Sequence, residues 1–152
     1  MYARYAMACT ASVLLLGCAG TGKECAFPQA TGKDAAEVIV FYPIDQTHKF
    51  IFNPDQPISI DECIVGELKY GSYFRYRVTP HAHKVRVEAP AMASFDVPEL
   101  ERKFTPGERV YVQFRVEARR LNGSMMGAHG ILAETNKNYA QGKVPALYSI
   151  DP

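Results

Sequence analysis

The sequence predicts an all-β fold: an antiparallel β-sandwich of seven to eight short strands, with an N-terminal signal segment and an irregular C-terminal tail. Nine Tyr and eight Phe occur without any Trp, among many Val and Ile, and these residue types favour strands. Several segments alternate apolar and polar residues, as half-buried strands do. Turn residues separate these segments at intervals of about 8–12 residues, and no helical period lies between them. The 152 residues suffice for one such domain.

The first 17 residues resemble a bacterial lipoprotein signal peptide. Arg4 is the only charged residue before Lys23, and Ala6–Leu16 is an almost wholly apolar stretch, as in a secretory signal. The sequence Leu15-Leu16-Gly17-Cys18 then resembles a lipobox, in which a lipid is attached to the cysteine and the chain is cut just before it. The alternative is an apolar N-terminal helix buried in the fold.

Cleavage before Cys18 leaves a lipid-anchored protein without net charge. It removes Arg4, one of the 17 basic residues, so that the remaining basic residues equal the 16 acidic ones. Acyl chains contribute about 0.8 kcal/mol per buried CH₂, so several chains on Cys18 make a stable membrane anchor. By the same resemblance, Ala19 in the next position implies export to the outer membrane, with the protein facing the periplasm. Residues 18–35 are mostly small and polar and are expected to form a lipidated tether.

The sandwich domain is expected to span residues 36–118, and its first half contains four predicted strands. They are Glu37–Tyr42, Lys49–Phe52, Ile58–Ile60 and Cys63–Leu68. The first consists almost entirely of β-branched and aromatic residues, and Pro43 ends it. Turn residues at 53–55 and at Asp61-Glu62 separate the other three.

The second half of the domain shows the clearest alternation. Strands are expected at Ser72–Thr79, His83–Ala89 and Arg109–Ala118, and less regular ones at Ser94–Val97 and Leu100–Phe104. Because successive side chains of a strand point to opposite faces, one face of each regular strand is expected to form the core. The inward residues are Phe74, Tyr76, Val78, Val85, Val87, Val112, Phe114 and Val116.

The strands at 72–79 and 83–89 are expected to pair as a hairpin. Pro80 does not fit a primed two-residue turn, so a four-residue loop, Thr79–Ala82, joins them and sets Val78 opposite His83. This register places like charges opposite each other on the outer face. It predicts an anion-binding patch of Arg75, Arg77, Lys84, Arg86 and Arg115. The alternative is that glutamates on neighbouring strands neutralise these charges.

Residues 119–152 are expected to form an irregular tail. Glycine occurs at 123, 127, 130 and 142, and apolar residues are scattered. Only Glu134–Gln141 is compatible with two helical turns.

Five segments together resemble a bacterial lipoprotein family known as domain-of-unknown-function family twenty-eight forty-six. They are VIVFYP (Val38–Pro43), ISIDECIVGEL (Ile58–Leu68), GSYF (Gly71–Phe74), TPHAH (Thr79–His83) and TPGERVY (Thr105–Tyr111). Glu62 and His81 each stand where the family has a turn glycine. The resemblance implies a prealbumin-like β-sandwich and a lipoprotein context. It implies no activity and therefore no catalytic residues.

Two cysteines remain after Cys9 leaves with the signal and Cys18 takes the lipid. Cys25 and Cys63 are expected in an oxidising compartment, where they either form a disulfide or stay as two thiols. A disulfide would contribute roughly 3–4 kcal/mol through the entropy of the loop that it closes.

The histidines do not predict a metal site. His81 and His83 alternate along a strand and share a side, but a site needs three or four ligands, and His48 and His129 are distant in sequence. Copper binding by Met125, Met126 and His129 rests on a glycine-rich segment and is disfavoured.

The function predicted is that of a lipid-anchored protein of the cell envelope, acting as a binding or structural module. No catalytic residue and no cofactor are expected, because no nucleophile elbow and no phosphate-binding glycine loop occur. The expected partners are the membrane and an anionic envelope component or envelope protein. A net charge of +1 argues against nucleic acid. The alternatives are a hydrolase of envelope glycans and a periplasmic metal-binding protein.

Overall fold

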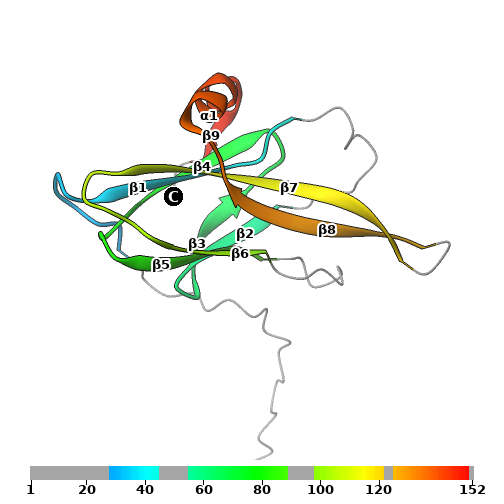
Figure 1. The fold of residues 1–152 in the computed structure, drawn as a ribbon, viewed down its shortest axis with the longest axis horizontal. Coiled ribbons are helices and arrows are strands. Elements are labelled where there is room, and N and C mark those ends of the chain that lie inside the picture. The colour runs from blue at the N-terminus through cyan, green and yellow to red at the C-terminus, as the bar shows by residue number, and fades with distance from the viewer. Residues whose placement is uncertain (1–27, 45–54, 89–97, 122–124, 151–152) are drawn as a thin grey trace, which may run out of the picture.

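The computed structural model describes residues 28–44, 55–88, 98–121 and 125–150, which fold into two β-sheets stacked as layers (Figure 1). One sheet has five strands in the order β8-β7-β1-β4-β9, and the other has four strands in the order β3-β2-β5-β6. This confirms the mostly-β class. No helix within the described ranges is long and apolar enough to cross a membrane.

The element bounds follow the predicted strands closely where these lie within the described residues. They are β1 (Ala36–Phe41), β2 (Gln56–Ile60), β3 (Cys63–Leu68), β4 (Ser72–Val78), β5 (Ala82–Val87), β6 (Glu99–Lys103), β7 (Arg109–Leu121), β8 (Met125–Glu134), α1 (Lys137–Lys143), η2 (Val144–Ala146) and β9 (Tyr148–Ile150). The predicted strands Lys49–Phe52 and Ser94–Val97 lie outside the described residues, as do the signal segment and tether up to residue 27.

The four-stranded sheet is antiparallel, as expected, whereas the five-stranded sheet is mixed. Its central strand β1 runs antiparallel to β4, with Val38 opposite Tyr76, and parallel to β7, with Val38 opposite Val110. β9 runs parallel to β4. The parallel pair of β1 and β7 is possible because a long stretch of chain separates them, whereas a tight hairpin joins only antiparallel strands.

The inner faces of the two sheets enclose one hydrophobic core. All eight residues predicted to face inward belong to it, so the predicted facing of β4, β5 and β7 is confirmed. Phe74 is fully buried, and the packing leaves no room for a side chain at Gly66, whose Cβ would clash with the Phe74 ring. β3 therefore lies close to the opposite sheet at this glycine.

The predicted hairpin of β4 and β5 is wrong. β4 pairs with β1 and β9, and β5 pairs with β2 and β6, so these two strands lie in different sheets. The segment Thr79–His81 carries the chain from one layer to the other. Both strands keep one apolar face toward the same core in either arrangement, so the alternation alone did not distinguish a hairpin from a crossing.

The predicted irregular tail is also wrong. β8 pairs with the long strand β7 from Val112–Glu134 to Leu121–Met125, and the two form a ribbon that extends beyond the rest of the sheet (Figure 1). The short helix α1 follows, with the Asn136 side chain accepting a hydrogen bond from the Asn138 N–H at 2.7 Å. α1 lies on the outer face of the five-stranded sheet, where Ala140 packs with Ile39, Phe41 and Tyr111.

Replacing Phe74 with Ala is expected to lower the free energy of unfolding by about 3–5 kcal/mol, because the cavity opens in the centre of the core. Urea unfolding measures this loss. Gln113→Ala, on the outer face of β7, is the matched control and should change the stability by no more than about 0.5 kcal/mol. A larger loss for Gln113→Ala than for Phe74→Ala would contradict the facing of these strands.

Candidate metal site

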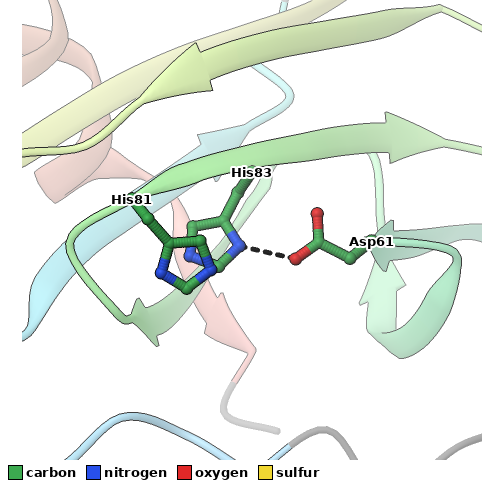
Figure 2. A group of neighbouring side chains, drawn as sticks. All are labelled: Asp61, His81 and His83. Atoms are coloured by element: carbon green, nitrogen blue, oxygen red, sulfur yellow. Dashed lines mark hydrogen bonds and ion pairs between the residues drawn. The ribbon is translucent and has the colours of Figure 1, made fainter.

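Three side chains with metal-ligating atoms meet where two connections of the fold come together: Asp61, His81 and His83 (Figure 2). Asp61 and Glu62 form the two-residue turn between β2 and β3, with φ values of 49° and 70°. Positive φ at both positions is the mark of a primed hairpin turn. Asp tolerates this conformation better than most residues, and it directs its carboxylate sideways toward β5.

Two hydrogen bonds to the Lys84 backbone, one from the backbone and one from the side chain of Asp61, hold Asp61 against β5. Its N–H donates to the Lys84 carbonyl at 2.9 Å, and its Oδ1 accepts from the Lys84 N–H at 2.9 Å. The carboxylate therefore takes the place of a neighbouring strand's carbonyl. Its second oxygen, Oδ2, lies 2.6 Å from Nδ1 of His83.

His83 is the innermost member of the group, with a fully buried side chain. It occupies the inward position of β5 that precedes Val85 and packs against the Phe104 ring at 5.8 Å. Nε2 lies 2.9 Å from the Thr79 carbonyl oxygen. The ring is thus held between the turn before β3 and the crossing from β4.

His81 is exposed and lies over His83, with 4.0 Å between the ring centroids. Nδ1 is 2.8 Å from Oγ1 of Thr79. The backbone at His81 is fixed as well, because its carbonyl accepts from the Phe104 N–H at 2.9 Å.

The potential ligand atoms of these residues all lie within 4.8 Å of one another. Each residue also has a second polar atom engaged elsewhere: Asp61 Oδ1 with the Lys84 N–H, His83 Nε2 with the Thr79 carbonyl, and His81 Nδ1 with the Thr79 hydroxyl. Metal-ligating histidines and carboxylates are usually held in this way by partners behind them. The expectation that His81 and His83 lack a third ligand is therefore wrong, because the fold supplies Asp61.

The five residues of the predicted anion-binding patch do not form one surface. Arg75, Arg77 and Arg115 project from the outer face of the five-stranded sheet, whereas Lys84 and Arg86 project from the other sheet. Most of them have acidic partners: Glu37 lies 3.4 Å from Arg75, Glu117 3.3 Å from Arg115, and Glu99 3.4 Å from Lys84 and 3.6 Å from Arg86. The prediction of a single anion-binding patch is thus wrong, because it depended on the predicted hairpin of β4 and β5.

The remaining candidates fall partly outside the described residues. Cys63 is disulfide-bonded, and its partner lies outside the described ranges, so the pairing with Cys25 stays a prediction. Cys18 and His48 lie there too. The backbone of β8 includes Met125, Met126 and His129, but their side chains are not among those described.

A second polar cluster, which sequence reasoning missed, connects the two sheets. Arg102 of β6 donates to Glu134 of β8 at 2.7 Å and to Glu108, just before β7, at 2.8 Å. The hydrogen bond from Arg102, and next that from the Thr105 backbone, lower the pKa of Glu108 from 4.5 to about 2. The hydrogen bonds that Arg102 makes to Glu134 and, next, to Glu108 raise the pKa of Arg102.

No protein-family model, curated protein or solved structure matches this chain. The resemblance to the lipoprotein family therefore rests on the five quoted segments alone.

The ion pair of Glu108 should make the fold sensitive to acid. Because the pKa of Glu108 is lower in the folded state than its ordinary 4.5, ionised Glu108 stabilises the fold above about pH 5, and this contribution is lost as the pH falls toward 2. Glu108→Gln should therefore be less stable at pH 7 and lose less stability on acidification. Urea unfolding at pH 7, 5 and 3 measures both effects. Glu117→Gln, which changes an exposed acid of β7, should show the same dependence of stability on pH as the parent. If Glu108→Gln also lost as much stability on acidification as the parent, the stabilising role of ionised Glu108 would be contradicted.

Proposed function

We propose that this protein is a lipid-anchored protein of the cell envelope that binds one divalent transition-metal ion through Asp61, His81 and His83. The observation that carries the metal proposal is the convergence of two imidazoles and one carboxylate from three backbone positions that are each fixed by hydrogen bonds. The lipobox-like Leu15–Cys18 supports the anchor. The two-sheet architecture accords with the prealbumin-like sandwich that the family resemblance implies.

The donor set favours ions such as Zn²⁺. Two histidines and a carboxylate, with a position left for solvent, are typical of sites that bind a metal without enclosing it. Zinc bonds to nitrogen are about 2.0–2.1 Å long, so two ligands of one tetrahedral ion lie roughly 3.3 Å apart. The 2.6 Å contact of Asp61 Oδ2 with His83 Nδ1 has to open by under an ångström for an ion to replace the shared proton. Exposed His81 can supply its Nε2, because the Thr79 hydroxyl lies closer to Nδ1, at 2.8 Å, than to Nε2, at 3.4 Å.

The geometry supports metal binding better than glycan hydrolysis. Hydrolysis of a glycosidic bond needs two carboxyl groups, one of which carries a proton to the leaving group. Among the described residues, Glu108 and Glu134 are brought together by Arg102, and the lowered pKa of Glu108 keeps it ionised. We therefore assign this cluster a structural role, the connection of the two sheets.

Zinc should bind to the metal-free full chain with one ion per molecule, and Asp61→Asn and His81→Ala should each weaken binding by at least tenfold. Isothermal titration measures the affinity, and Co²⁺ absorption reports the ligand set. His81 is exposed, so His81→Ala removes a ligand without opening a core cavity. Glu62→Gln changes the neighbouring acid of the same turn, and its affinity for zinc should lie within twofold of the parent's. Absence of zinc binding by the folded parent, or equal losses in Asp61→Asn and Glu62→Gln, would overturn the metal proposal.

The anchor is tested separately. Expression in a Gram-negative host with an alkyne fatty acid should label the parent, whereas Cys18→Ser should remain as an unlabelled, uncleaved precursor. Cys9→Ser is the control and should be labelled and processed as the parent is. Equal labelling of Cys18→Ser and the parent would refute the anchor and leave the metal proposal untouched.

A further inference from the structure

A charged pocket of about 410 Å³ opens at one end of the five-stranded sheet. Strands β1, β4 and β7 supply Glu37, Arg77 and Arg109, and the connections that precede β1 and β7 supply Lys33 and Gly107-Glu108. The two connections are joined by a hydrogen bond from the Gly107 N–H to the Asp34 carbonyl at 3.2 Å. The pocket is thus built from three separate segments of the chain, residues 33–37, Arg77 of β4 and residues 107–109.

The strand register places one acidic residue of the pocket lining, Glu37, between two arginines. Glu37 lies opposite Arg77 of β4 on one side and opposite Arg109 of β7 on the other. The Glu37 side chain is only 17% exposed, and its carboxylate contacts Arg109 and Arg75, the latter at 3.4 Å, and not Arg77. Glu37 is therefore already neutralised by two other arginines.

Arg77 and Lys33 are the cations that the pocket leaves without an acidic partner. Within the described part of the chain, Arg77 pairs with no acidic side chain and donates from one terminal nitrogen to the Gly32 carbonyl. Lys33 is exposed and makes no ion pair with a described residue. The other acid of the lining, Glu108, is taken by Arg102 and by Thr105, whose N–H and hydroxyl each lie 2.9 Å from Oε2.

We infer that this pocket binds a small molecule through a carboxylate held by Arg77 and Lys33. The planar guanidinium of Arg77 has donors left to grip a carboxylate with two parallel hydrogen bonds, and Lys33 adds a mobile positive charge. The pocket volume lies in the usual range for small-molecule sites and suits a ligand of the size of an amino acid or a sugar acid. A singly charged carboxylate fits better than phosphate, because the lining has three basic and two acidic side chains, an excess of one positive charge that one carboxylate balances and a dianion exceeds.

Binding is tested on the ¹⁵N-labelled full chain, with a chelator present so that the metal site plays no part. Titration with N-acetylalanine should shift the amide resonances of Lys33, Gly107 and Glu108 in a saturable way. N-acetylalanine amide, which lacks the charge, and inorganic phosphate at equal concentration should produce shifts at least tenfold weaker. Raising the salt from 20 to 500 mM should weaken the binding of N-acetylalanine, since exposed charges are screened.

Arg77→Gln should weaken the binding of N-acetylalanine at least tenfold, whereas Arg115→Gln, on the same sheet face but outside the pocket, should leave it within twofold of the parent. Lys33→Gln provides a second variant whose exposed side chain plays no part in the core. Equal shifts with the uncharged amide, stronger binding of phosphate, or parent-like binding by both Arg77→Gln and Lys33→Gln would overturn the assignment.

Discussion

The passage of the chain from one sheet to the other between β4 and β5 determines much of this fold, and His83 fixes it. The ring lies between the Asp61 carboxylate at 2.6 Å and the Thr79 carbonyl at 2.9 Å, so it joins the β2–β3 turn to the crossing itself. Polar groups buried at such a place need partners, and here both ring nitrogens have them. The crossing in turn allows β4 to flank β1 while β5 flanks β2.

Local pattern predicted which residues face the core, but not which strands are neighbours. Alternation along β4, β5 and β7 identified the inward side chains because burial acts on each strand separately. Pairing is a property of two segments, and the same alternation suits a hairpin and a crossing equally. β8 shows the opposite case: Met125–Glu134 has little alternation, and it forms a strand because the long β7 offers it ten residues of backbone to pair with.

The sequence predicted only part of the candidate metal site, because local pattern does not show which segments become neighbours. His81 and His83 are two residues apart and could be placed on one side of a strand, whereas Asp61 precedes them by two strands, β3 and β4, which lie in different sheets. The turn at Asp61-Glu62 was recognised, but only the pairing of β2 with β5 brings it beside Lys84. Aspartate is a common residue at a primed turn, so the turn itself gave no local signal that Asp61 has a second role.

The central place of β1 has a mechanical consequence. A load applied to β1 along its own axis acts on the middle strand of the five-stranded sheet. β1 is hydrogen-bonded on one side to β4 and on the other to β7, so such a pull must shear both ladders together and cannot peel them apart bond by bond.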